Sequence, residues 1–137
     1  MSANARDLLA RVSVFVDGFS RAAAETVVEP GSPTHEGLNE LVRHSLVAFD
    51  GELDRFRMLD TIREYGQDSL AAMHAVDITR ERQAEWLAQL IADSEAAFSS
   101  GRDRAVALDR ADAERRNIRD ALAWAVRGDW RHPRPAA

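Results

Sequence analysis

The stretch Ser45–Tyr65, SLVAFDGELDRFRMLDTIREY, decides the fold of this chain. Residues 46–49 are apolar and favour a strand, and they run into Asp50-Gly51, a pair that supplies the positive φ of a tight reversal. Residues 55–58 then alternate polar and apolar side chains, which is typical of a half-buried return strand. A Thr-x-x-Glu capping box at Thr61 marks the start of a helix. The stretch therefore predicts a two-stranded wing followed by a helix.

Three short helices are predicted before the wing. The first is expected to end at Asp17-Gly18, because glycine suits the left-handed position that closes a helix. The second covers about Arg21–Val28 after the N-cap Ser20, and the third follows the Pro30–Pro33 loop. Positions at helical spacing give the expected core of the first and third helices: Leu8, Leu9, Val12, Phe15, Leu38, Leu41, Val42 and Ser45.

The helix after the wing is expected to run from Thr61 to about Met73, with Tyr65 and Leu70 on its inner face. Gly66 lies inside this helix, where it costs about 1 kcal/mol relative to alanine. We expect this glycine to allow close packing against the wing or a neighbouring helix.

Two longer helical patterns follow, over Thr79–Phe98 and about Ala105–Val126, with a break at Ser99-Ser100-Gly101 between them. Two helices with a short connection form an antiparallel pair. The fold class that we predict is mainly α. It consists of a winged helix-turn-helix with a small β-hairpin wing over residues 5–75, an antiparallel helical hairpin over 77–128, and a disordered tail over 129–137.

Composition excludes several classes of site. The chain has no cysteine, which rules out disulfides, thiolate metal sites and cysteine nucleophiles. All 18 basic residues are arginine, so the lysine that a P-loop needs is absent. The formal net charge of −5 weighs against a nucleic-acid binder, which usually carries a basic balance or stripe.

No apolar run approaches the roughly 20 residues that a membrane helix needs, and the start of the chain lacks the apolar core of a signal peptide. We therefore predict a cytoplasmic protein without a membrane segment. We expect it to hold no cofactor.

Direct DNA binding is the less favoured interpretation of the third helix. A winged helix reads DNA with basic and amide side chains there. The candidates are Asn39, Arg43 and His44 on this helix and Arg55 and Arg57 on the wing. Glu36 and Glu40 would repel phosphates, and the wing arginines lie beside acidic residues. We expect a solvated or partner-facing surface.

No catalytic or metal site is indicated. His35-Glu36 begins a zinc-protease pattern, but the position of the second histidine holds Asn39. An apolar stripe on the long helix, with Trp124 on the last one, is expected to be mainly intramolecular core. The alternative is that Trp86, Leu90 and Trp124 belong to an exposed face that a protein partner covers.

Five blocks of the sequence, at residues 8–19, 23–27, 41–47, 56–65 and 108–125, occur together in a recognisable order. They resemble the winged-helix region of bacterial STAND-type ATPases, the LuxR-type and antibiotic-regulator-type transcription regulators common in actinobacteria. The resemblance implies that the last block leads into a tetratricopeptide-like sensor array. It also implies a nucleotide-binding domain before the winged helix, and no such domain lies within these 137 residues.

The triplet Met58-Leu59-Asp60 stands where related signalling ATPases carry Met-His-Asp, whose histidine senses the bound diphosphate. Leu59 cannot donate a hydrogen bond to phosphate. We therefore expect a degenerate sensor motif, with Leu59 in the core of the wing and Asp60 as a helix N-cap.

These observations predict a non-enzymatic regulatory or interaction module, similar to the arm that couples nucleotide state to sensor repeats in such regulators. Its partner would be a protein or a neighbouring ATPase or sensor domain. The alternative is a small stand-alone winged-helix regulator that binds DNA. A remnant without a selected function is a third interpretation. The oligomeric state is left open by the sequence.

Overall fold

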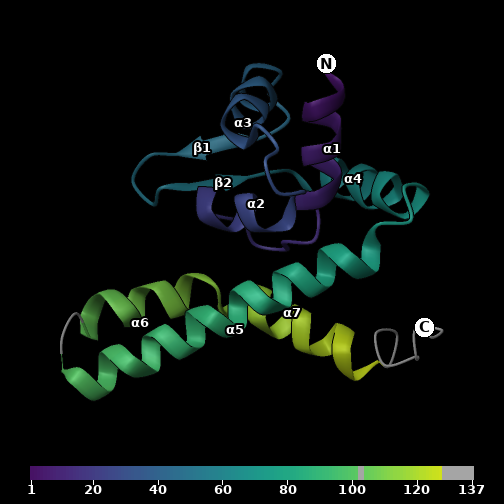
Figure 1. Ribbon diagram of the computed structural model, residues 1–137. Coiled ribbons are helices and arrows are strands. Elements are labelled where there is room, and N and C mark those ends of the chain that lie inside the picture. The colour runs from purple at the N-terminus through teal and green to yellow at the C-terminus, as the bar shows by residue number, and fades with distance from the viewer. Residues whose placement is uncertain (102–103, 128–137) are drawn as a thin grey trace. The chain divides into compact units, whose positions relative to one another are not determined.

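The structure is a computed structural model that describes residues 1–101 and 104–127 (Figure 1). As predicted, it is mainly helical with one antiparallel β-hairpin. The elements in chain order are α1 (Ala3–Val12), α2 (Arg21–Val27), α3 (Thr34–Arg43), β1 (Ala48–Asp50), β2 (Arg55–Arg57), α4 (Asp60–Ala72), α5 (Val76–Ser100), α6 (Arg104–Ala113) and α7 (Arg115–Val126). Within the described ranges, no helix is long and apolar enough to cross a membrane.

The chain divides into two compact units, Met1–Gln83 and the residues from Ala84 onward. The first unit holds the winged helix and also the first eight residues of α5, whereas the predicted helical hairpin begins at residue 77. We call residues 76–83 the α5 root. The tail expected at 129–137 lies outside the described residues.

Helix α1 is the centre of the first unit, because α2, α3 and α4 all pack against it. Its predicted stripe is confirmed, since Leu8, Leu9, Val12 and the following Phe15 are all at most 2% exposed. Leu38 and Leu41 of α3 are fully buried as expected. Two other positions assigned to that core are corrected: Val42, in the last turn of α3, and Ser45, which follows the helix end at Arg43 with a positive φ of 59°, are both exposed.

Helix α1 ends at Val12, five residues before the expected stop at Asp17-Gly18. Gly18 does have a positive φ of 76°, but for a different reason. A Cβ atom at Gly18 would lie 2.7 Å from the backbone oxygen of Phe56, so a side chain there would clash with β2. The glycine allows Phe19 to form an isolated antiparallel bridge with Phe56.

The predicted hairpin is confirmed, with Phe49 paired to Phe56 at the centre of its register. The reversal does not depend on the positive φ expected at Asp50-Gly51. Four residues, 51–54, connect the strands, and the Asp50 carboxylate accepts hydrogen bonds from the backbone N–H groups of Glu52 and Leu53 at 3.0 and 3.2 Å. The positive φ falls on Asp54, at 55°. We call β1, β2 and this loop the wing.

Helix α4 begins at Asp60, one residue earlier than expected, and no side chain caps its first turn. The capping box expected at Thr61 is therefore not formed. The reason proposed for Gly66 is confirmed, because a Cβ there would lie 2.8 Å from Cβ of Ser13 and 3.0 Å from the backbone oxygen of Leu9. Tyr65, expected on the inner face, is 59% exposed, while Leu70 is buried.

In the second unit, the helix expected over 105–126 is two helices, α6 and α7, with a break at Glu114. Within this unit α6 runs back alongside α5, as the expected hairpin requires (Figure 1). The winged helix is therefore followed by helical hairpins.

Candidate functional site

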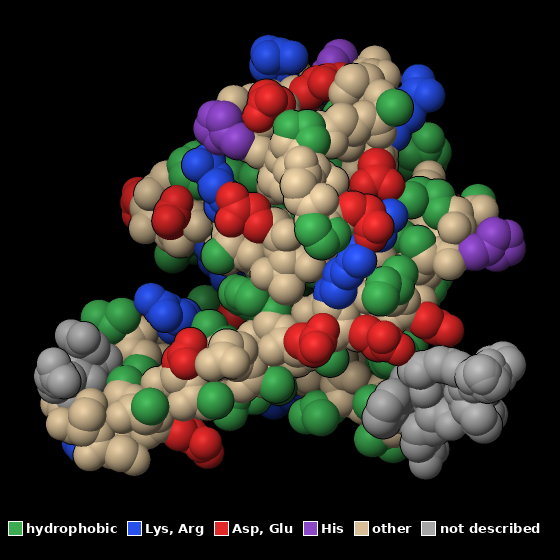
Figure 2. All heavy atoms as spheres, viewed as in Figure 1, with side chains coloured by type: hydrophobic (Ala, Val, Ile, Leu, Met, Phe, Trp, Pro, Cys, Tyr) green, Lys and Arg blue, Asp and Glu red, His purple; other side chains and the backbone are tan. Residues whose placement is uncertain are grey.

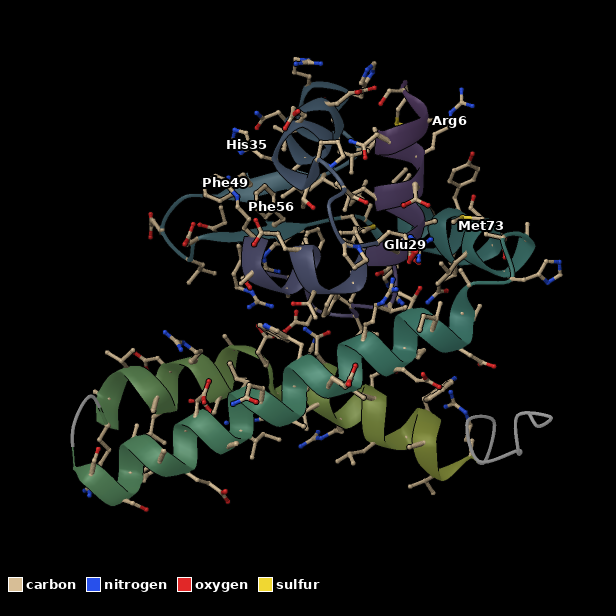
Figure 3. The ribbon with its side chains drawn as sticks, in the orientation of Figure 1. Arg6, Glu29, His35, Phe49, Phe56 and Met73 are labelled. Carbon is tan, nitrogen blue, oxygen red and sulfur yellow. The ribbon has the colours of Figure 1, made fainter. Side chains whose placement is uncertain are left out.

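The candidate contact residues on α3 are accessible. Asn39, Arg43 and His44 are exposed, and so is Arg57 at the end of β2. The amide of Asn39 lies 3.2 Å from Nε2 of His35, one helical turn earlier, so these two side chains form a pair on the surface of α3. Together with the wing, these side chains make up the surface that we call the α3–wing face; Figure 3 labels His35 on α3 and Phe49 on the wing.

Arg55, the remaining candidate, is corrected as a surface contact. It is 8% exposed, and its guanidinium donates to the backbone oxygen of Asp17 at 3.1 Å. The loop after α1 covers this side chain, whereas Arg57 on the same strand reaches solvent. The structure therefore separates two arginines that the strand alternation had placed together.

Carboxylates are interspersed with the arginines on the α3–wing face. Glu36 is exposed in the first turn of α3, and Glu52 and Asp54 are exposed in the wing loop. Residues 1–83 hold 14 acidic side chains against 9 arginines, which accounts for the whole net charge of −5. Figure 2 accordingly shows red and blue side chains mixed over α3 and the wing, without a continuous blue surface.

Glu40 on α3 faces the start of α1. Its carboxylate accepts from the backbone N–H and the hydroxyl of Ser2, the latter at 2.8 Å. These two hydrogen bonds stabilise the charged form and lower the pKa of Glu40 below its ordinary value of 4.5. Glu40 therefore joins α3 to α1 and remains anionic at neutral pH.

The triplet Met58-Leu59-Asp60 lies between the wing and α4. Leu59 is 72% exposed, which corrects the expectation that it belongs to the core of the wing. It is the N-cap residue of α4, and Asp60 is the first residue of that helix, where a negative charge suits the helix dipole. The alternation of polar and apolar side chains on the return strand stops at Met58. It therefore gave no indication that the next apolar side chain, Leu59, would be exposed.

The α5 root is held to the first unit by buried polar side chains. Thr79 and Gln83 lie one turn apart on α5 and are both fully buried. Gln83 donates from Nε2 to the backbone oxygen of Val14 at 3.2 Å, and Arg11 of α1 lies 3.4 Å from the Thr79 hydroxyl. Arg11 in turn pairs with Asp7 at 2.9 Å. Because buried polar groups must find partners, these bonds fix the position of the α5 root along α1.

An ion pair joins the α5 root to the loop after α2. Arg82 lies 2.7 Å from the carboxylate of Glu29, and the hydrogen bond and charge of this arginine lower the pKa of Glu29 below 4.5. None of the residues in this connection was a candidate from the sequence. Periodicity identifies apolar faces, but it does not indicate which polar side chain will be buried.

The stripe on α5 that was expected to be mainly intramolecular core is only partly buried. Leu90 is 7% exposed, while Trp86 and Trp124 are half-buried. The apolar side chains that reach solvent in this unit are instead Ile91, Phe98, Val106, Leu108, Leu122 and Val126.

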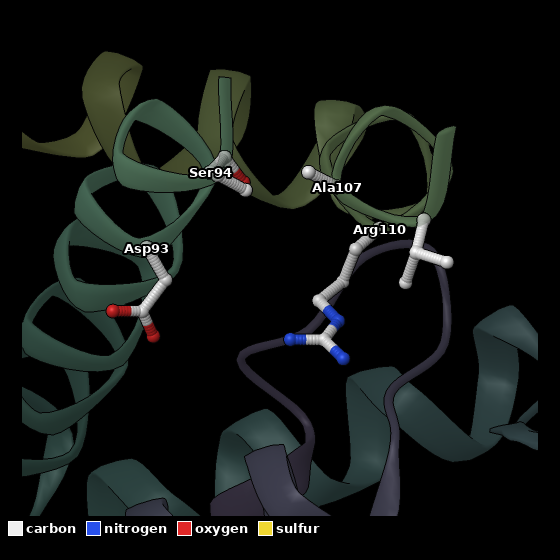
Figure 4. A pocket seen from close by; sticks show the side chains of 6 residues that line it. Asp93, Ser94, Ala107 and Arg110 are labelled. Atoms are coloured by element: carbon white, nitrogen blue, oxygen red, sulfur yellow. The ribbon is translucent and has the colours of Figure 1, made fainter. Parts of the chain in front are cut away.

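A small cavity of about 180 Å³ lies between α5 and α6 (Figure 4). Asp93 and Ser94 line it from α5, and Ala107 and Arg110 line it from α6. Small-molecule sites usually have volumes of about 300–1,000 Å³. The described residues contain no group of three side chains that could hold a metal ion.

Comparison with protein families matches residues 1–71 to the winged helix-turn-helix domain. No curated protein and no solved structure matches the chain. The matched region covers α1 to α4 with the wing, which are the elements that enclose the core of the first unit. The chain therefore belongs to the winged helix-turn-helix domain family.

Proposed function

We propose that this chain is a non-enzymatic regulatory module in which a winged helix holds the base of a long helix that leads to protein-binding repeats. The observation that carries the proposal is the α5 root. Thr79 and Gln83 bury their polar groups against α1 and the loop after it, and both belong to α5, a single helix of 25 residues. A change at the winged helix would thus act on α5 at a fixed point.

The finer form of the proposal is the arm of a STAND-type transcription regulator in the cytoplasm. The sequence blocks quoted above support it, and the second unit would then begin a tetratricopeptide-like array. The partner would be a neighbouring ATPase or sensor domain, or a separate protein. The exposed apolar side chains of α6 and α7 are compatible with such a partner.

A stand-alone DNA-binding regulator is the second candidate, and two observations favour it. The chain belongs to a family named for the helix-turn-helix, and Asn39, Arg43 and Arg57 are exposed where a winged helix can contact DNA. Charge weighs against it. Glu36, Glu52 and Asp54 share that face, and the net charge of the first unit is negative. Binding to DNA depends on neutralising phosphates with basic side chains.

A gel shift with generic duplex DNA at low and moderate salt separates the two candidates. We expect no salt-sensitive complex for the wild-type chain. The control is the triple variant Glu36→Arg, Glu52→Arg, Asp54→Arg, which makes the α3–wing face basic and should acquire salt-sensitive binding. A wild-type complex that weakens steeply with salt, and that Arg43→Ala with Arg57→Ala removes, would establish the DNA-binding function instead.

A further inference from the structure

Four phenylalanines form a continuous row from the core of the first unit to its surface. Ring centroids are 5.7 Å apart for Phe15 and Phe19, 5.6 Å for Phe19 and Phe56, and 4.9 Å for Phe56 and Phe49. The first three rings are at most 5% exposed, whereas Phe49 on β1 is 47% exposed. The row therefore ends in a half-exposed ring at the outer edge of the wing (Figure 3).

The backbone of Phe49 also faces outward. Phe56 uses both its N–H and its carbonyl on Phe19, at 2.8 and 3.0 Å, so these groups point away from β1. Phe49 is directly opposite Phe56 in the antiparallel register, which makes the two a pair without mutual hydrogen bonds. In such a pair the N–H and carbonyl of Phe49 point away from β2, toward the free edge of the sheet.

From this geometry we propose that the β1 edge pairs with the β1 edge of a second copy, antiparallel, about a two-fold axis at Phe49. The two Phe49 residues would exchange N–H to carbonyl hydrogen bonds, and the two rings would meet on the same face. The aromatic row would thus run unbroken from one core to the other. Because one patch pairs with itself, the assembly closes as a dimer.

Charge supports a second copy as the occupant. In this register Asp50 of the second copy lies opposite Ala48, and Ala48 is paired with Arg57 on β2. All three side chains share one face, and the small Ala48 lets the exposed Arg57 reach across to that carboxylate. The contact occurs twice by symmetry. The acidic wing loops lie at opposite ends of the paired strands, so they do not oppose each other.

The pairing involves only three residues of each strand, which is far less than a standard interface of about 1,600 Å². We therefore expect a weak dimer, with a dissociation constant on the order of 100 µM. This inference concerns assembly and does not depend on the regulatory function proposed above.

Sedimentation equilibrium of the full chain from about 10 µM to about 1 mM tests the proposal by mass action. We expect the average mass to rise toward that of a dimer. Phe49→Pro removes the outward N–H and the ring without removing a β1–β2 hydrogen bond, and it should leave the chain monomeric throughout. A wild-type chain that stays monomeric overturns the proposal, and so does a dimer that Phe49→Pro leaves unchanged.

A charge variant tests the same register without touching β1. Arg57→Glu places a carboxylate next to Asp50 of the second copy and should weaken association at least tenfold. Arg21→Glu, at the exposed start of α2, makes the same change in net charge away from the edge and should leave association within about twofold. Equal effects of the two variants would contradict the register. This pair of variants decides the question if Phe49→Pro fails to fold.

Discussion

The two units bury their apolar side chains very differently. Of the 21 buried hydrophobic residues among those that the structure describes, 18 lie in Met1–Gln83 and three lie beyond it. Large apolar side chains are exposed in both units: Leu59 is 72% and Tyr65 is 59% exposed in the first, and Leu122 is 60% and Val126 is 73% exposed in the second. The first unit therefore has its own core, whereas the described part of the second buries few apolar side chains and also leaves apolar surface that another element can cover.

Charge follows the same division. The first unit carries the whole net charge of −5, while arginines and carboxylates balance in the rest of the chain. The α5 root links the two, because α5 begins inside the acidic, well-packed unit and ends in the other. This difference is what an arm with a folded base and a partner-binding end requires.

The largest expected difference between the units is the loss of stability when one large apolar side chain is truncated in each. Phe19→Ala removes a ring that is 1% exposed, so we expect a loss of about 3–5 kcal/mol in the free energy of unfolding. Leu122→Ala removes a side chain that is 60% exposed and should cost less than about 0.5 kcal/mol. Urea unfolding followed by circular dichroism measures both. Similar losses for the two variants would mean that the units share one core.

The tight contact between α1 and α4 gives the next largest effect. Gly66→Val should destabilise the first unit by about 1–3 kcal/mol, because a side chain there meets Ser13 and the backbone oxygen of Leu9. Ala72→Val, at the exposed end of the same helix, has similar chemistry without the clash. Thermal unfolding compares the two. A Gly66→Val chain as stable as the Ala72→Val chain would show that α4 can move away from α1.

Two glutamine substitutions compare the α5 root with the part of α5 that follows it. Gln83→Leu keeps the volume but leaves the carbonyl of Val14 without its donor, so we expect a loss of about 1–2 kcal/mol. Gln89→Leu, two turns later, removes only an exposed bond to Asp93 and should cost less than about 0.5 kcal/mol. Urea unfolding of both variants measures whether the α5 root is anchored to the first unit or is as exposed as the residues that follow it. Equal, small effects would contradict the buried connection.

The smallest effect is the pH dependence of the Glu29–Arg82 pair. The pKa of Glu29 is lowered in the folded chain, so its stabilising effect is present above its ordinary value of 4.5 and is lost as the pH falls through the lowered value. The Tm difference between wild type and Glu29→Gln should therefore be largest at neutral pH and shrink in acid. Calorimetry over this range measures it. A difference that grows in acid would have the wrong sign.

Local patterns were sufficient for the elements that depend on neighbouring residues. The strand alternation and the Asp-Gly pair found the wing, and Ser20 caps α2 as expected, accepting from the N–H of Ala23 at 3.2 Å. The unbroken stretch from 105 to 126 contains neither glycine nor proline. For that reason no local signal could place the break at Glu114.

The parts of the candidate site that depend on distant contacts could not be predicted. Arg55 is covered by a backbone oxygen 38 residues away, and Gln83 reaches one 69 residues away. Phe19 stands alone between a turn and a helix cap, so no alternation marked it as a partner of β2. The preceding Gly18 indicated a close contact with another backbone segment, but we interpreted this glycine as the end of a helix.

Native-state hydrogen exchange of the full chain tests most directly whether the winged-helix unit includes the base of α5. The decisive amides are those of residues 80–83, compared with α1 and with residues 87–100. We predict that the root amides open with the same free energy as the slowest amides of α1, within about 0.5 kcal/mol, and well above those further along α5. Root amides that instead exchange together with residues 87–100 would contradict the account.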